Sequence, residues 1–495
     1  MIEVALDASK KYAPVNLGRV LILGLGKTGQ AVSKYCAELV GSRIESLTIA
    51  AGAFSEPAQS FVDELPHEGI TTLFDTYSFE ESYDVCIASP GISQFSEFYQ
   101  AALAHCTELI SEVEFAWRES SADSEWVAIT GTNGKTTTTA LAAHLLSSCG
   151  KRAQAVGNIG DTCLEAAVDC YVAEVSSYQL ASTSRFAPDV AVLLNITPDH
   201  IKWHKSFEAY CEAKRKVFAN CAAGSTIILD ATNDIVREYV KELRKQFDVL
   251  DSSVVVPLGT KEGIASSMIE RCGASSAAYS DKGTLVVERS GKRVELINQT
   301  ELNIKGEHNV LNALAAAAAT LSLVDVSCYG DVDVSCYGDL RKALASFQPL
   351  EHRIEPCGTV KGVRCYNDSK ATNVDATLKA LAAFGKEKPF VLLGGDDKGT
   401  DLTELVRAAN KHTLGVVCFG AAGPRFFEAF SEAEVPVFSA EHLEDAFDTA
   451  LEQVKPGDIV ILSPACASFD EFSCFEERGE VFKNLVVKRA SERGA

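Results

Sequence analysis

The sequence predicts an α/β protein of three domains. Its 495 residues are enough for about three domains of ordinary size. From residue 19 onward, short apolar runs alternate with helical patterns, which is typical of parallel sheets covered by helices. We therefore expect a Rossmann-like domain over 1–121, a central domain of the P-loop type with a mostly parallel sheet over 122–347, and a second Rossmann-like domain over 348–495.

The first segment begins with a strand at Arg19–Leu23, followed by a glycine turn and a helix that is apolar at 31, 32, 35 and 39. Two more strands are expected within "SLTIA" and "DVCIASPGI". The polar stretch Arg118–Glu125 then predicts a linker to the second segment.

The second segment begins with an apolar strand at Trp126–Ile129 that leads into another glycine loop and a helix. "CYVAEVSS" and "VAVLLNITPDH" are nearly continuous apolar strands that end in polar residues, as buried parallel strands do. An alanine-rich helix at Asn309–Leu323 closes the segment. "VDVSCYGD" then occurs twice in tandem, at Val324–Asp331 and Val332–Asp339, and we interpret it as a local duplication that lengthens a surface loop.

The third segment begins near Pro349 and has the pattern of a second doubly wound sheet. Its strands are expected within "FVLLGG", "GVVCFG", "VPVFS" and "DIVILS".

The composition is that of a soluble globular protein, with 46% hydrophobic and 23% charged residues. A formal net charge of −22 argues against nucleic acids and anionic membranes as partners. We find no apolar run of the length of a signal peptide or a membrane span. The 16 cysteines form no CxxC pair, so we expect reduced thiols in a cytoplasmic protein rather than a disulfide framework or a zinc site.

The first glycine loop, with Gly24, Gly26 and Gly29, matches GxGxxG between a strand and a helix. Such a turn brings backbone amides close to a diphosphate at a helix N-terminus. A dinucleotide site would also have Asp or Glu at the end of the next strand, where Ala50–Gly52 stands instead. NAD binding is therefore disfavoured. Another nucleotide diphosphate, or a turn required only for close helix–strand packing, remains open.

The second glycine loop, "TGTNGKTTT", predicts a phosphate site. Gly131 and Gly134 let the backbone wrap a phosphate at a helix N-terminus. Lys135 adds a positive charge, and the Thr136 hydroxyl is placed to ligate Mg²⁺. The common pattern GxxxxGK[ST] needs glycine where Ile129 stands, so this loop is shorter. An ordinary turn and helix cap would explain the threonines poorly, because β-branched residues are poor helix formers.

Polar residues follow the next strands. Glu174 ends a strand where a metal-holding acid is expected, although a solvent-facing glutamate is the simpler alternative. His200 and His204 have the spacing of two metal ligands on a helix, but Ile201 stands where a zinc hydrolase needs Glu, so Mg²⁺ and substrate suit this histidine better. The basic run Lys214–Lys216 is interpreted most simply as a solvated face.

Taken together, the motifs "TGTNGKTTT", "GNIG", "EVSSYQL", "NITPDH", "YCEAKRKVF", "GEHNVLNA" and "EHR" resemble those of the Mur ligase family, in the same order and over nearly the whole chain. "YNDSKATN", "LLGGDDKG" and "SPACASFDEFSCFEERGEVF" are similar to motifs of the members that add D-glutamate. The resemblance implies ATP-dependent ligation of D-glutamate to UDP-N-acetylmuramoyl-L-alanine through an acyl phosphate. It further implies cytoplasmic peptidoglycan precursor synthesis by a monomer.

The resemblance also implies roles for individual residues. The catalytic residues would be Lys135, His200, Lys214 and Lys370. ATP would be bound by Gly131, Thr132, Asn133, Gly134, Lys135, Thr136, Thr137, Asn309, Asn312 and Arg353. Mg²⁺, at two sites, would be held by Thr136, Glu174, His200 and a carbamylated Lys214. The UDP-substrate would contact Gly26, Lys27, Thr28, Ser89, Pro90, Gly91 and Asn158. D-Glutamate would contact Lys370, Thr372, Lys398, Ser468 and Phe475.

Three positions depart from the family pattern. Lys202 stands where many members have an acid, and Ala50 and Ala51 lack the polar groups that some members use around uracil. Three alternative functions remain open. They are a ligase that adds another amino acid or resembles folylpolyglutamate synthetase, an oxidoreductase that uses the first glycine loop, and a catalytically inactive binding protein.

Overall fold

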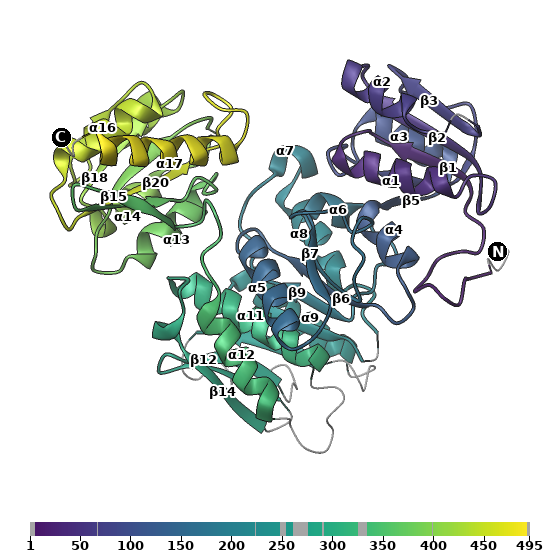
Figure 1. Ribbon diagram of the computed structural model, residues 1–495, viewed down its shortest axis with the longest axis horizontal. Helices are drawn as coiled ribbons and strands as arrows, with labels where there is room; N and C mark the ends of the chain where they lie inside the picture. Colours follow the sequence, from purple (N-terminus) through teal and green to yellow (C-terminus); the bar gives the residue numbers. More distant parts are fainter. Residues whose placement is uncertain are drawn as a thin grey trace. The chain divides into compact units, whose positions relative to one another are not determined.

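The computed structural model describes residues 5–66, 68–222, 224–247, 254–260, 276–289, 292–324, 334–397 and 399–492. The chain forms three mostly parallel sheets covered by helices, which confirms the predicted α/β class (Figure 1). By internal contacts it divides into two compact units, residues 1–301 with 311–345 and residues 302–310 with 346–495. The three predicted domains are a finer division than these units and stay a prediction.

The first sheet has the strand order β3-β2-β1-β4-β5, all parallel, which is the order of one Rossmann-type half and its neighbours. Its strands are β1 (Gly18–Leu23), β2 (Ile44–Gly52), β3 (Ile70–Phe74), β4 (Tyr83–Ala88) and β5 (Cys106–Ser111). Its helices are α1 (Lys27–Glu38), α2 (Glu56–Asp63), α3 (Glu97–His105) and α4 (Glu112–Glu119). The sequence analysis predicted β1, β2 and β4 but missed β3 and β5, whose polar positions break the apolar pattern.

The second sheet has nine strands in the order β14-β13-β12-β11-β10-β9-β6-β8-β7. The strands from β7 to β12 run parallel, and β13 and β14 form an antiparallel edge. The strands are β6 (Glu125–Thr130), β7 (Ala153–Gly157), β8 (Cys170–Glu174), β9 (Val190–Leu193), β10 (Thr226–Asp230), β11 (Val254–Gly259), β12 (Ser276–Asp281), β13 (Thr284–Arg289) and β14 (Lys292–Asn298).

The helices that follow these strands in the chain include the predicted helix after the phosphate loop. They are α5 (Lys135–Ser148), α6 (Ser177–Ala181), α7 (Ile201–His204), α8 (Phe207–Arg215), η1 (Lys216–Phe218), α9 (Asp234–Phe247), η2 (Gln299–Glu301), α11 (Glu307–Val324) and α12 (Val334–Ser346). Most of the first "VDVSCYGD" copy lies outside the described residues. The second copy enters α12 at Val334, so the prediction that the duplication forms only a surface loop is wrong for that part.

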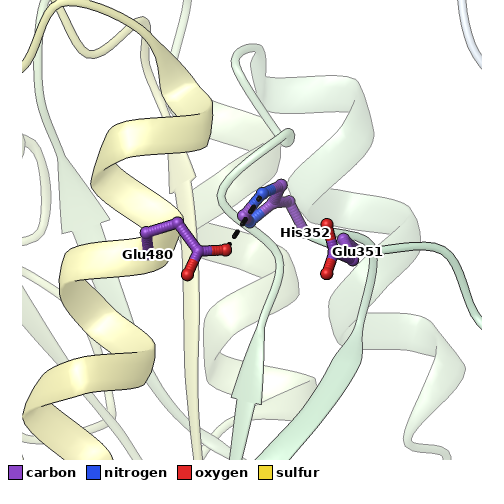
Figure 2. Close-up of side chains that lie close together, drawn as sticks. All are labelled: Glu351, His352 and Glu480. Atoms are coloured by element: carbon purple, nitrogen blue, oxygen red, sulfur yellow. Dashed lines mark ion pairs between the residues drawn. The ribbon is translucent and has the colours of Figure 1, made fainter. Parts of the chain in front are cut away.

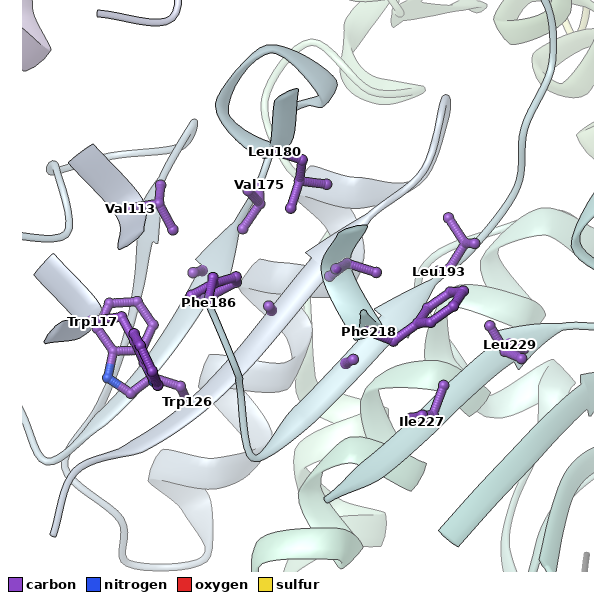
Figure 3. Close-up of a cluster of buried hydrophobic side chains, with 14 of the residues drawn as sticks. Val113, Trp117, Trp126, Val175, Leu180, Phe186, Leu193, Phe218, Ile227 and Leu229 are labelled. Atoms are coloured by element: carbon purple, nitrogen blue, oxygen red, sulfur yellow. The ribbon is translucent and has the colours of Figure 1, made fainter. Parts of the chain in front are cut away.

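A hydrophobic core fills one side of the second sheet (Figure 3). Trp126 of β6 stacks on Tyr171 of β8 at 4.4 Å between ring centroids, and Phe186 packs edge-on against Trp126 and Trp117. Because Trp117 belongs to α4, this core reaches from the second sheet into the last helix of the first sheet.

The predicted linker Arg118–Glu125 is solvated only in its middle, where residues 121–123 are exposed, whereas its first three residues are buried. Arg118 is only 5% exposed and makes ion pairs with Glu108 and with Glu114, which is fully buried. The Trp126 indole nitrogen donates to the Ser120 hydroxyl at 3.0 Å. Arg118 looked like a linker residue because its charge is neutralised in the interior by two acids outside the stretch, which the pattern of single residues does not reveal.

The third sheet lies in the second unit and has the order β15-β16-β20-β17-β18-β19, with β15 antiparallel and the other strands parallel. The predicted strands are confirmed. They are β17 (Phe390–Gly394), β18 (Gly415–Phe419), β19 (Val437–Ser439) and β20 (Ile459–Ala465), joined by β15 (Glu355–Val360) and β16 (Val363–Asn367). The helices are α13 (Val374–Ala383), α14 (Thr403–His412), α15 (Gly423–Ala429), α16 (Leu443–Gln453) and α17 (Phe475–Ser491).

The 13 cysteines whose side chains the structure describes all carry free thiols, as predicted. Within the described ranges, none of the helices is both long and apolar enough to cross a bilayer.

Candidate functional site

The phosphate loop joins the carboxyl end of β6 to the N-terminus of α5. Gly131 and Gly134 have φ values of +154° and +88°, which residues other than glycine rarely adopt. A Cβ atom on Gly134 would also collide with the Asn312 side-chain oxygen. Both glycines are therefore required by the backbone, and Asn312, predicted to bind ATP, lies against the loop.

Asn195, which the sequence analysis did not select, braces the loop from the end of β9. Its backbone oxygen accepts from Thr132 N at 2.7 Å, and its side chain exchanges two 2.9 Å hydrogen bonds with the Asn133 backbone. The Thr132 hydroxyl lies 2.8 Å from the Tyr210 hydroxyl. A polar residue directly after a buried strand was the signal available in the sequence.

Two lysine side chains reach the same loop. Lys135 donates from Nζ to the carbonyl oxygens of Gly131 and Thr132, both at 2.9 Å. Lys214 donates to the Gly131 oxygen at 2.7 Å, and its Nζ lies 4.8 Å from the centre of the Tyr210 ring. Burial, and then the charge of Lys135, lower the pKa of Lys214 well below its ordinary value.

The interpretation of Lys214–Lys216 as a solvated face is wrong. Lys214 is only 2% exposed, and Lys216 donates to the carbonyl oxygens of Ala181 and Thr183. Thr136 and Thr137 are also buried, in the first turn of α5. Their hydroxyls and the Lys214 amine therefore belong to the interior around the loop.

Glu174 is the last residue of β8, which pairs with β6, the strand before the phosphate loop. It is 2% exposed, so the solvent-facing alternative is wrong. Its Oε1 accepts from the Asn158 side chain at 2.8 Å, which joins the predicted metal ligand to "GNIG". Its Oε2 is buried without a hydrogen-bond donor. Burial of a carboxylate oxygen is costly unless a donor or a cation pairs with it.

His200 and His204 differ in their surroundings. His204 is fully buried and bonded to the Ser177 hydroxyl at 2.9 Å, and burial lowers its pKa to about 4. The His200 side chain is 40% exposed, with Nδ1 2.6 Å from the Tyr178 hydroxyl and Nε2 3.6 Å from Asp199. The two histidines therefore do not form a zinc pair, and His200 is the one available to a ligand.

The first glycine loop approaches "GNIG". The ammonium group of Lys27 donates to the Gly160 oxygen at 2.6 Å, and the Ser89 hydroxyl donates to the Gly24 oxygen at 3.1 Å. A Cβ atom on Gly29 would overlap the Gly24 carbonyl group, so glycine at position 29 is required for the close packing of α1 against the turn after β1. The remaining predicted residues of this group flank these contacts, at Gly26, Thr28, Pro90 and Gly91.

The second unit brings together most of the residues predicted to bind D-glutamate. Lys370 Nζ lies 4.2 Å from the centre of the Phe475 ring, and Thr372 N donates to the Lys370 oxygen. Ser468, in the "SPACASFDEF" segment, is also buried. Lys398 lies outside the described residues.

Arg478, another residue that sequence analysis missed, ties this region together. It is fully buried and donates to Ser369 and to the carbonyl oxygens of Cys466 and Ala467. One guanidinium group thus joins the "NDSKATN" and "SPACASFDEF" segments. Its position in "EERGE", within a charged helix, gave no sign of burial.

Arg353 lies in the second unit near Asp368, and its charge lowers the pKa of that carboxyl against a larger effect of burial. Asn309 lies in the first turn of α11 and donates from its side chain to the Lys305 oxygen at 2.7 Å. These contacts place both predicted ATP residues in the second unit, whereas Asn312 belongs to the first.

Glu351, His352 and Glu480 form a further cluster in the second unit (Figure 2). The ammonium group of Lys483 lies 2.6 Å from Glu480 and within 3.7 Å of both Glu351 and Glu355. A cation is therefore already present, and the cluster is an internal salt-bridge network rather than a metal site.

A cavity of about 450 Å³ lies at the amino ends of β4 and β5, lined in part by Asp84 and Thr107. The glycine turn at Gly24 follows the carboxyl end of β1, at the opposite edge of the same parallel sheet. Glu108 in the cavity wall is already paired with Arg118. This cavity is separate from the candidate site.

The sheet topology and the lysine-bearing loop at the carboxyl end of β6 define an α/β nucleotide-binding protein. Residues 129–320 match a family model described as the Mur ligase middle domain, and residues 352–466 match one described as the Mur ligase glutamate ligase domain. The chain belongs to the Mur ligase family.

Individual proteins give the same relationship. A UDP-N-acetylmuramoylalanine–D-glutamate ligase from Koribacter versatilis is 36% identical over 485 residues, which cover 96% of this chain and 98% of the relative. The enzyme of that name from Salinibacter ruber is 36% identical over 483 residues, with 94% and 97% covered. The MurF ligase from Thermotoga maritima, solved in complex with ADP, shares the fold, with a TM-score of 0.55, 18% identity, and 97% and 99% covered.

Proposed function

We propose that the protein ligates D-glutamate to UDP-N-acetylmuramoyl-L-alanine at the expense of ATP, with ADP and phosphate as the other products. The observation that carries this proposal is the 36% identity, over 96% of the chain, to a ligase of that name. The reaction would serve peptidoglycan precursor synthesis in the cytoplasm. We further propose a monomer, without nucleic acid or a membrane as partner.

The chemistry requires activation of a carboxylate, which is a poor electrophile. Transfer of the γ-phosphoryl group of ATP to the substrate carboxylate gives an acyl phosphate and ADP. The D-glutamate amine then attacks the acyl carbon, loses a proton, and expels phosphate. Negative charge gathers at each step, so fixed cations and donors lower the barriers.

Lys135 is suited to the β- and γ-phosphates of ATP. Its ammonium group is bonded to two loop carbonyls, a position from which it can turn to a bound phosphate. Thr132, Asn133 and the two glycines would supply the backbone cradle. Asn312, beside Gly134, would contact the nucleotide from the other side. Asn309 and Arg353 are proposed as further ATP contacts.

Thr136, Glu174 and His200 fit Mg²⁺ by donor type, and the unpaired Glu174 Oε2 supports a cation there. Bound Mg²⁺ would offset charge on the phosphates and the transferring group. Lys214 would join as a carbamate, formed when the neutral amine adds to CO₂ and releases a proton. A second Mg²⁺ site would depend on that carbamate.

The other substrates would bind at the remaining clusters. Lys27 and Thr28, with the segment Ser89–Gly91, would receive the UDP moiety, and Asn158 would contact substrate or phosphate. Lys370 and the other predicted residues of the second unit, with Lys398, would hold the D-glutamate carboxylates.

The test is a coupled assay of ADP release with purified protein. ADP should appear only with UDP-N-acetylmuramoyl-L-alanine and D-glutamate together. A panel of acceptors, including L-glutamate, L-lysine and diaminopimelate, distinguishes other amino-acid-adding ligases. Turnover with L-glutamate, or without an acceptor, contradicts the proposal. NAD(P)H binding would favour the oxidoreductase alternative.

A further inference from the structure

Tyr178 makes a short contact with a residue of the candidate site. Its hydroxyl oxygen lies 2.6 Å from Nδ1 of His200, and the two rings meet edge-on with centroids 5.0 Å apart. Tyr178 follows β8 directly, on α6. A capping box between Ser176 and Gln179 fixes the start of this helix, so the direction of Tyr178 is set by the local backbone.

The Tyr178 ring is held in place independently of its hydroxyl. It stacks on Trp203 with centroids 4.4 Å apart and lies 5.7 Å from the His204 ring. His204 is itself bonded to Ser177, the residue before Tyr178. Removal of the hydroxyl should therefore leave the ring where it is.

His200 has less support from its own backbone. It is the N-cap of α7, which has only four residues, and its φ of +54° is unusual for a residue with a side chain. Its imidazole is 40% exposed. A ring on such a short turn has rotational freedom unless a neighbour restricts it, and the Tyr178 hydroxyl is placed to do so.

We infer that Tyr178 is a positioning residue for the ligation, in that its hydroxyl holds Nδ1 of His200 and thereby directs Nε2 toward Asp199. Asp199 also interacts electrostatically with Lys214, whose amine contacts the phosphate loop, so Nε2 lies beside a carboxylate that is coupled to that loop. The inference rests on the proposed function. A hydrogen bond to one ring nitrogen also selects the tautomer, and so decides which nitrogen offers a lone pair.

The phenol keeps its proton under assay conditions, because burial and the Asp199 charge raise the pKa of Tyr178 to about 12. Tyr178 can therefore act as donor or acceptor toward Nδ1, according to the tautomer of His200.

The chain offers a matched control. Tyr171 also stacks on a tryptophan, Trp126, at 4.4 Å, and its hydroxyl donates to the Ala166 oxygen at 3.2 Å. Tyr178→Phe and Tyr171→Phe thus remove the same hydroxyl from the same kind of stacked pair. Only the first loses a contact with His200.

The experiment compares kcat, KM and the Mg²⁺ concentration for half-maximal rate in the two variants, and records the ¹⁵N shifts of the His200 ring nitrogens in ligand-free protein. Tyr178→Phe should lower kcat or raise the Mg²⁺ requirement about tenfold, with shifted ring nitrogens and the melting temperature of the control. Tyr171→Phe should match the wild type in kinetics and in the His200 shifts.

Wild-type kinetics in Tyr178→Phe, or unchanged His200 shifts, overturn the inference. The nitrogen shifts need no substrate. If the wild-type protein fails to ligate D-glutamate, the proposed function is wrong, while the shifts still decide whether Tyr178 orients His200.

Discussion

The side-chain nitrogen of Lys214 lies 2.7 Å from the carbonyl oxygen of Gly131, so a buried lysine is anchored on the phosphate loop itself. A second lysine, Lys135, is bonded to the same oxygen. Two positive charges so close together oppose each other, and burial adds to the cost of the charged form. Burial first, and then the charge of Lys135, lower the pKa of Lys214 well below its ordinary value, so more of its amine is neutral than in an exposed lysine, and the neutral amine is the form that adds to CO₂.

Carbamylation of Lys214 is the first prediction. Removal of CO₂ from the buffer should lower the rate of ADP release, and bicarbonate should restore it. Protein equilibrated with ¹³C-bicarbonate should show a carbamate resonance that disappears in Lys214→Arg and persists in Lys216→Arg. Full activity without CO₂, or a carbamate signal in both variants, would count against it.

Lys135→Ala should reduce ADP release about 100-fold or more, because the transferring phosphoryl group loses its fixed cation. The melting temperature should change little, since the Lys135 ammonium group donates to two carbonyl oxygens of its own loop. Lys151→Ala, which breaks an ion pair with Glu125 in the same sheet, is the control and should keep wild-type activity. A Lys135 variant with more than a tenth of the wild-type rate contradicts the role.

Glu174→Gln should raise the Mg²⁺ concentration for half-maximal rate about tenfold or more. The oxygen of the Gln side chain can still accept a hydrogen bond from Asn158, but the substitution removes the negative charge that the buried Oε2 would offer to a metal ion. Stability should be unchanged or higher, because an unpaired buried carboxylate is costly. Glu112→Gln is the matched control, since Glu112 is equally buried but accepts from Leu164 N. Its Mg²⁺ dependence should equal that of the wild type.

Phe475→Leu should raise KM for D-glutamate about fivefold and leave KM for ATP unchanged. The centre of the Phe475 ring lies 4.2 Å from Lys370 Nζ, and such a cation–π contact is worth about 1 kcal/mol. Without the ring, the ammonium group of Lys370 is held less firmly in the position proposed to bind D-glutamate. Phe469→Leu, at an exposed position of the neighbouring turn, is the control. Equal KM values for D-glutamate in both variants would refute a role for Phe475.

The stability of the second unit should fall as pH rises from about 4 to about 7. Burial raises the pKa of Asp368 to about 7, above the value of about 3.9 in an unfolded chain. Between these two pKa values the folded state binds more protons than the unfolded state. The stability that the Asp368 proton contributes is therefore fully present below the unfolded pKa and is lost as the pH rises through the folded pKa. Asp368→Asn should flatten this slope in melting curves recorded against pH.

Glu112→Gln provides the comparison in the first unit, because burial raises the pKa of Glu112 to about 7 as well. It should flatten only the transition of that unit. A slope that persists in Asp368→Asn would show that another group titrates there.

Local patterns were enough to predict much of the fold. Continuous apolar runs such as β6, β17 and β18 are recognisable because parallel strands are buried on both faces. β3, with its two threonines and partly exposed positions, lacks that signal. The phosphate loop was predictable because two glycines with positive φ and a lysine are adjacent in sequence.

The supporting residues of the site were not predictable in the same way. Asn195 is 62 positions from Asn133, and Tyr178 is 22 positions from His200. Such contacts depend on which strand ends meet, and a single sequence shows the strand ends but not their neighbours. The burial of Lys214 was missed for the same reason.

The buried salt bridges of Arg118 have a consequence for how the protein can be dissected. A fragment that stops at residue 121 would retain Glu114 but lose Ser184 and Arg185, whose backbone amides donate to its carboxylate. It would also strip Trp117 of its aromatic neighbour Phe186. We expect such a fragment to be aggregation-prone, so a soluble dissection product should keep the first two sheets joined.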